Sequence, residues 1–285
     1  MKATKISIPA SDGYLLEAKV FEPENARGAV MVNSGTGIPK EFYGRLAQHL
    51  ASQNYAVVIY DYRGIGGSRP ATLRGFQAFM HEWGEKDMTG VLDWLAQRYP
   101  ALPKFALAHS VGGQLIGLMP NHRELSAVLM VGTSTGYWRW FPAPFKYYCA
   151  FVWYGFVPFH ARFTGYVPSK KIGQGEDLPA GVAQEWAHWC KHKDYLAIDF
   201  GKSIKENFYN EIKTPIMALG FTDDNIANKR TMPAILDFYR NAPKEIEWIA
   251  PSDIGKQKIG HFGFFSSKNK EHFWHKPTEW FAQFN

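Results

Sequence analysis

The stretch FALAHSVGGQ, residues 105–114, places one serine between an apolar run and a pair of glycines. The apolar run up to residue 109 predicts a buried strand, and residues 111–119 predict a helix. Small residues on both sides of Ser110 allow the strand and the helix to pass close together. We therefore predict a sharp strand–turn–helix in which Ser110 is strained and exposed as a nucleophile. The alternative is an ordinary glycine-rich turn.

Strands alternate with helices through the rest of the chain. Two segments with alternating polar and apolar residues predict an antiparallel hairpin around the sequence SDG. Continuous apolar runs predict buried strands, and residues at helical spacing lie between them. This order predicts an α/β fold with a mostly parallel central sheet flanked by helices. The predicted strands are 4–9, 14–22, 29–34, 56–62, 104–109, 127–132, 215–221 and 245–250; the predicted helices are 39–54, 85–99, 111–119, 229–240 and 271–284.

The alternation stops between residues 134 and 210, a segment too long to be a simple loop. Nearly half of residues 137–166 are aromatic, but the uninterrupted apolar run is shorter than the roughly 20 residues that cross a bilayer. We expect a helical cap here, inserted into a core domain made of 1–133 and 211–285. A pocket between cap and sheet is expected. Its predicted wall includes Trp138 and Trp153 from the cap and Phe262 from the core.

A serine nucleophile needs a base that a third group orients. GFTDDNIA, residues 220–227, places Asp223 and Asp224 directly after a predicted strand. IGHFGFF, residues 259–265, places His261 in a glycine-flanked loop before the last helix. The order serine, acid, histidine is the one that a nucleophile elbow in such a sheet requires. Taken singly, the aspartates are also typical of turns and the histidine of a loop.

At these motifs the chain resembles the α/β-hydrolase family. DYRGIGGS (61–68) is similar to the family's turn after its fourth strand, and AHSVGGQ to its nucleophile elbow. FTDDNIA and GHFGFF resemble its acid and histidine loops, and the segment 134–210 falls where family members insert a lid. FYGRLAQHLASQNYAVVIYDYRGIGGSRP, GYWRW and IGHFGFF resemble a bacterial subgroup known mainly as predicted hydrolases.

The resemblance implies a catalytic triad. Ser110 would be the nucleophile, and His261 would act first as general base and then as general acid. Asp224 is preferred over Asp223 as the orienting carboxylate because Ile226 completes the family's Asp-x-Ile spacing.

The resemblance also implies an oxyanion hole made of two backbone N–H groups. One belongs to Val111, and we assign the other to Thr36. The family usually carries His-Gly-x at the second position, whereas this chain has Ser34-Gly35-Thr36. Because a main-chain N–H does the work, the missing histidine affects only the local packing of the loop.

The predicted function is hydrolysis of a carboxylic ester, a thioester or a lactone through an acyl-enzyme. The aromatic cap favours a small-molecule substrate with a hydrophobic acyl group, acyl lactones included. This chemistry requires no cofactor and no metal. Two alternatives stay open on the same fold: a cofactor-free carbon–carbon bond hydrolase and a non-catalytic binding protein.

Other functions are disfavoured by composition and spacing. The net charge of +6 is scattered along the chain, so no nucleic-acid surface is expected. Cys149 and Cys190 form no disulfide framework, and the N-terminus has no signal-peptide pattern, so we expect a cytoplasmic protein. His188 and His192 have metal-binding spacing on a helix, but no carboxylate-rich motif follows them. The sequence leaves open whether the chain forms a homodimer.

Overall fold

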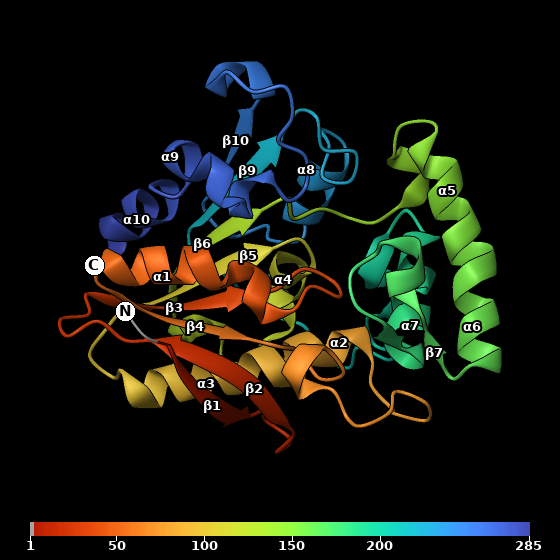
Figure 1. Ribbon diagram of the computed structural model, residues 1–285, viewed down its shortest axis with the longest axis horizontal. Coiled ribbons are helices and arrows are strands. Elements are labelled where there is room, and N and C mark those ends of the chain that lie inside the picture. The colour runs from red at the N-terminus through yellow and green to blue at the C-terminus, as the bar shows by residue number, and fades with distance from the viewer. Residues whose placement is uncertain (1–2) are drawn as a thin grey trace.

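The computed structural model describes residues 3–285 and is built on an eight-stranded sheet (Figure 1). The strand order is β1-β2-β4-β3-β5-β6-β9-β10. β2 pairs antiparallel with β1 and β4, and all other neighbours in this sheet pair in parallel, as the sequence predicts. The strands are β1 (Thr4–Pro9), β2 (Leu15–Phe21), β3 (Gly28–Asn33), β4 (Tyr55–Tyr60), β5 (Lys104–His109), β6 (Leu125–Val131), β9 (Ile216–Phe221) and β10 (Lys244–Ile249).

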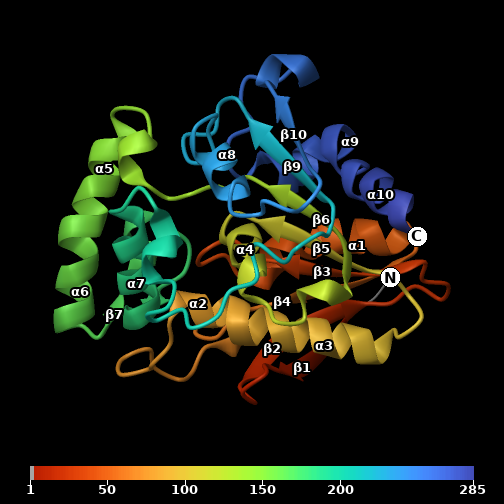
Figure 2. The same cartoon turned by 180° about the vertical axis from the view of Figure 1, so that it is seen from behind.

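Helices cover both faces of the sheet (Figures 1 and 2). Alternate residues of one strand enter different cores, as the two-residue period of a strand requires. In β3, Val30 and Val32 pack with the core under α1, α9 and α10, whereas Ala29 and Met31 pack with the core under α3, α4 and α8. These helices are α1 (Gly44–Ser52), α3 (Thr89–Arg98), α4 (Val111–Gln114), α8 (Thr231–Leu236), α9 (Lys270–Phe273) and α10 (Lys276–Phe281).

The helix predicted for 111–119 is α-helical only as far as Gln114, and a 3₁₀ turn follows at Leu115–Leu118. Tyr209 lies so close that a Cβ on Gly117 would come within 2.1 Å of its ring. The hydroxyl of Tyr209 donates to the carbonyl of Gln114 at 2.6 Å, and Tyr239 donates to that of Gly113 at 2.6 Å. These hydroxyls satisfy carbonyls that the interrupted helix leaves free.

Residues 134–210, here called the inserted segment, leave the sheet after β6 and return before β9. α5 (Phe145–Phe151), a π-helical turn (Val152–Phe156) and α6 (Val157–Phe163) form one rod at the outer edge of the molecule (Figure 1). α7 (Ala180–Cys190) lies between this rod and the core, and a short hairpin pairs β7 (Tyr166–Val167) with β8 (Leu178–Pro179). Within residues 3–285, no helix has both the length and the apolar character needed to cross a membrane.

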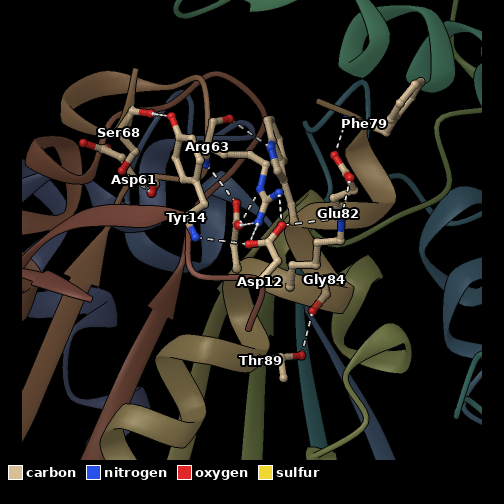
Figure 3. Close-up of polar contacts among 12 residues, drawn as sticks. Asp12, Tyr14, Asp61, Arg63, Ser68, Phe79, Glu82, Gly84 and Thr89 are labelled. Atoms are coloured by element: carbon tan, nitrogen blue, oxygen red, sulfur yellow. Dashed lines mark hydrogen bonds and ion pairs between the residues drawn. The ribbon is translucent and has the colours of Figure 1, made fainter. Parts of the chain in front are cut away.

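A buried ionic cluster joins the first hairpin to the helical layer (Figure 3). Arg63, in the loop after β4, donates through Nε to Asp87 at 2.7 Å and through both terminal nitrogens to Asp12 at 2.8 and 2.9 Å. Asp87 belongs to a π-helical turn (Trp83–Met88) that follows α2 (Met80–Glu82). Burial raises the pKa of Asp87 to about 7 even beside the guanidinium, so this charge depends strongly on Arg63.

Replacing Arg63 by Gln should destabilise the fold by about 3–5 kcal/mol, because it leaves Asp87 buried without its cation. Protonation of Asp87 removes the buried charge, so the loss of unfolding free energy in the variant should be larger at pH 8 than at pH 5. Urea unfolding at both pH values measures the effect. The matched control is Arg98→Gln, which removes an exposed pair with Glu22 and should cost under about 1 kcal/mol. Equal losses in both variants would contradict the role of the cluster.

Candidate active site

Ser110 lies in a strained turn between β5 and α4. Its φ of 51° and ψ of −116° are rare for any residue other than glycine. A Cβ on Gly112 would lie 2.5 Å from the carbonyl oxygen of Asn33, so α4 passes directly against the end of β3. The Ser110 amide donates to the carbonyl of Val131 at 3.0 Å, which fixes the turn to β6. The strand–turn–helix predicted around Ser110 is therefore present.

His261 and Asp224 form a hydrogen-bonded pair at the same edge of the sheet. His261 Nδ1 lies 2.6 Å from Asp224 Oδ2, and both side chains are at least nine-tenths buried. Asp224 Oδ1 accepts the N–H of Ile226 at 2.8 Å. Because a carboxylate only accepts hydrogen bonds, the proton of a neutral His261 sits on Nδ1 and Nε2 keeps its lone pair. This is the tautomer that a general base needs.

Asp223 makes a different contact. It accepts the N–H groups of Ile259 at 2.8 Å and of Gly260 at 3.0 Å, and no hydrogen bond within residues 3–285 joins it to the His261 ring. Asp223 thus holds the loop that carries His261, while Asp224 contacts the imidazole itself.

Ser110 and His261 both contact the segment in which β6 ends. Gly132 follows β6 with a φ of +60°, and a Cβ there would lie 3.2 Å from two atoms of the His261 ring. Gly132 comes directly after Val131, the residue that accepts the Ser110 amide. The part of the chain that the structure describes contains no hydrogen bond between Ser110 Oγ and His261. Such catalytic contacts often tighten only when substrate binds.

A second histidine, which the sequence analysis did not single out, ties the surrounding loops together. The N–H of Gly35 donates to the Tyr43 hydroxyl at 2.8 Å, and this hydroxyl lies 2.7 Å from His109 Nδ1. His109 Nε2 lies 3.2 Å from the carbonyl oxygen of His261. The direction is fixed at the other end because the His261 carbonyl can only accept: His109 carries its proton on Nε2, so Nδ1 accepts from the Tyr43 hydroxyl.

Burial lowers the pKa of His109 well below its ordinary value, which keeps this imidazole neutral. One feature of the sequence could have indicated the hydrogen bonds that His109 makes to Tyr43 and to the His261 carbonyl. His109 ends an otherwise apolar buried strand, and a buried polar group requires partners.

Two backbone N–H groups lie free near Ser110. Thr36 lines the same cavity as Ser110, and Val111 is the first residue of α4. Within the described residues, neither N–H donates a hydrogen bond, whereas the N–H of Gly35 is taken by Tyr43. The N–H of Thr36, which we chose from the sequence, is therefore free to bind a ligand, whereas that of Gly35 is not.

A mainly apolar pocket opens beside Ser110, with about 730 Å³ of empty space including its open mouth. Its outer wall is the inward side of the α5–α6 rod, and Trp153 belongs to it as predicted. A few polar side chains, Gln114 and Ser134 among them, stand near the serine. The lining also includes Phe141, Phe145, Tyr148, Cys149, Val152, Phe156, Val157, Ile172, Leu178, Trp186, Cys190, Tyr195 and Ile226.

Two predicted pocket residues lie elsewhere, and we correct them here. Trp138 sits in the turn before α5, where its ring packs against Tyr154 and under Arg139. Phe262 is 46% exposed and packs edge-on against Phe42 and His261, outside the cavity. Both are aromatic residues close in sequence to the site, but their backbone positions turn the rings away from the cavity.

His188, in α7, and His192, two residues after the helix ends, contact each other, with their ring centroids 4.9 Å apart. His188 Nε2 lies 3.6 Å from Asp199, and His192 Nδ1 lies 2.8 Å from the carbonyl of His188. Across residues 3–285, no three His, Cys, Asp or Glu side chains gather as a metal site would require.

The fold and this site define an α/β protein with a strained strand–turn–helix at Ser110. A family model described as serine aminopeptidase, S33, matches residues 24–158. No curated protein sequence matches the chain. The chain has the α/β-hydrolase fold, as the sequence predicted.

Solved structures share this fold over the whole chain at low identity. A soluble variant of monoglyceride lipase from Saccharomyces cerevisiae, bound to a substrate analogue, is 17% identical with a TM-score of 0.69, covering 98% of this chain and 97% of that one. The structure of DcsB with its substrate analogue is 15% identical with a TM-score of 0.69, and both chains are fully covered. A thermophilic esterase from Thermogutta terrifontis is 14% identical with a TM-score of 0.61, covering 99% of each chain.

Gly112→Ala should destabilise the protein by at least about 1–3 kcal/mol, because the new methyl group would collide with the backbone of Asn33. Thermal unfolding measures the loss. Gly44→Ala is the matched control, since a Cβ there meets no atom within 4 Å and its φ is −58°. A Gly112 variant as stable as the Gly44 variant would show that the elbow tolerates a side chain.

Proposed function

We propose that the protein is a serine hydrolase that cleaves esters, thioesters or lactones of hydrophobic acyl groups. The hydrogen bond between His261 and Asp224, at the sheet edge that carries the strained Ser110, supports this proposal most directly. Asp224 orients the imidazole, and Asp223 positions its loop.

In the proposed reaction, Ser110 Oγ attacks the carbonyl carbon while its proton passes to His261 Nε2. The negative charge that develops on the carbonyl oxygen is held by the N–H groups of Thr36 and Val111. When the tetrahedral intermediate collapses, the bond to the leaving oxygen or sulfur breaks, and His261 returns the proton to that atom. Water, deprotonated by the same imidazole, then cleaves the acyl-enzyme to release the acid and regenerate Ser110.

The substrate class follows from the pocket. Its wall is mainly aromatic and aliphatic, so it favours an apolar acyl chain, and Ser110 lines it together with a few other polar side chains. We propose that the inserted segment acts as a cap on a core of residues 1–133 and 211–285. The likeness to structures of a monoglyceride lipase and an esterase is consistent with this chemistry. The two free cysteines are consistent with a cytoplasmic location.

Ser110→Ala should lower kcat/KM for p-nitrophenyl acyl esters by about 10³-fold or more, because it removes the nucleophile. Asp224→Asn should lower it by about 10³–10⁴-fold through the wrong histidine tautomer. Ser52→Ala, at an exposed serine of α1 outside the pocket, is the control and should keep the activity. Labelling by a fluorophosphonate probe should require Ser110. Retained turnover and labelling in the Ser110 variant would refute the proposal.

Trp153→Ala should shift the preferred acyl chain towards longer or bulkier esters, because it removes an indole from the pocket wall. Trp138→Ala supplies a matched control, since this indole lies in the inserted segment but outside the lining. Rates on p-nitrophenyl esters of increasing chain length measure the preference. Identical profiles for wild type and the Trp153 variant would mean that the acyl chain lies elsewhere.

A further inference from the structure

The α5–α6 rod exposes aromatic side chains along its outer side. Tyr147, Phe151, Tyr154, Phe159 and Phe163 are each between 56% and 66% exposed. They recur every three to five residues, which keeps them on one side of a helical rod. We call these five residues the outer aromatic face. Large aromatic rings gathered on a surface in this way mark an interaction site rather than ordinary surface composition.

The segment that carries the outer aromatic face has an excess of positive charge, although one of its lysines, Lys170, pairs with Glu176 at 3.2 Å. From residue 125 to residue 175 the sequence contains no Asp or Glu, but it contains five cations: Arg139, Lys146, Arg162, Lys170 and Lys171. Lys146 and, from α7, Lys191 lie over the rings of Tyr147 and Tyr154 at 5.1 and 4.9 Å. A surface that joins exposed aromatics to an excess of cations is complementary to an anionic surface with an apolar layer beneath it.

The inner side of the same rod lines the pocket. Val152, Trp153 and Phe156 face the cavity that contains Ser110. Tyr148 belongs to both sides, because it lines the pocket and is 36% exposed. The rod therefore separates the proposed acyl site from the outer aromatic face by the thickness of a single helix.

We propose that the outer aromatic face docks on the surface of an anionic lipid bilayer, so that the hydrolase takes substrates dissolved in the membrane. The rod is the outermost part of the molecule on its side and runs along that edge, a shape that a broad lipid surface can meet without a matching groove (Figures 1 and 2). Tyrosine and phenylalanine enter the headgroup and acyl boundary, and the cations pair with anionic headgroups. The membrane source of the substrate rests on the proposed function, whereas the docking does not.

The test is co-sedimentation of the full chain with vesicles of equal parts phosphatidylglycerol and phosphatidylcholine. The Ser110→Ala background prevents hydrolysis during the assay. We expect binding that falls at least tenfold in the triple variant Phe151→Ser, Phe159→Ser, Phe163→Ser. We also expect at least tenfold weaker binding to pure phosphatidylcholine vesicles and at high salt. Leu15→Ser is the control, because Leu15 is 63% exposed in β2 of the core, and it should bind like the parent.

With Ser110 restored, the triple variant should hydrolyse a short water-soluble ester at the wild-type rate. Its rate of hydrolysis of an ester embedded in vesicles should be at least tenfold lower than that of the wild type. Equal vesicle binding by the triple variant and its parent would overturn the docking surface. The proposal would also be overturned if the parent protein does not bind vesicles but forms dimers in sedimentation velocity, and the triple variant does not form them. The outer aromatic face would then bind a second copy of the chain. Loss of soluble-ester turnover on Ser110→Ala tests the proposed function separately.

Discussion

The close approach of α4 to β3 is the constraint on which the site depends. A backbone such as that of Ser110 costs about 1–3 kcal/mol and persists only where its surroundings dictate it. Here the neighbouring strands β3, β5 and β6 are buried nearly throughout, and Gly112 alone lets the helix pass Asn33. The strain turns the serine side chain out of the sheet. It also leaves the N–H of Val111 at the free start of the helix, next to the same side chain.

The other site residues come together because parallel strands end at one edge. Asp224 follows β9, Gly132 follows β6 and His261 follows β10, although long stretches of sequence separate them. Hydrogen bonds to backbone groups then fix the positions of the loops that follow these strands. Asp223 holds the loop of His261, and the chain from Gly35 through Tyr43 and His109 links the loop after β3 to the histidine loop. The geometry thus rests on two kinds of contact: the neutral chain through Tyr43 and His109, and the carboxylates of Asp223 and Asp224 that hold the His261 loop and ring.

The sequence predicts those parts of this arrangement that are encoded locally. Continuous apolar runs identify the buried strands. The preference for Asp224 over Asp223 rests on the resemblance to the family's Asp-x-Ile spacing, and in the structure Asp224 Oδ1 accepts the N–H of Ile226, two residues on. Contacts between segments that are far apart in the chain produce no local sequence pattern from which they could be predicted. The early end of α4 depends on Tyr209, nearly a hundred residues away in sequence, and the pocket wall depends on how the rod settles on α7. Trp138 and Phe262 therefore could not be separated from Trp153 by sequence alone.

The rod shows how one helix can present apolar residues on two opposite sides for two different reasons. A helix that serves only as a wall over a cavity needs apolar residues on its inner side and polar ones outside. Leaving large aromatic rings in water is unfavourable by about 25 cal/mol for each Å² of apolar surface, so the outer aromatic face is costly to the isolated protein. That cost is recovered only where the rings leave water. Because the inner side of the same helix walls the cavity beside Ser110, any surface that removes the outer rings from water also lies one helix away from the proposed acyl site.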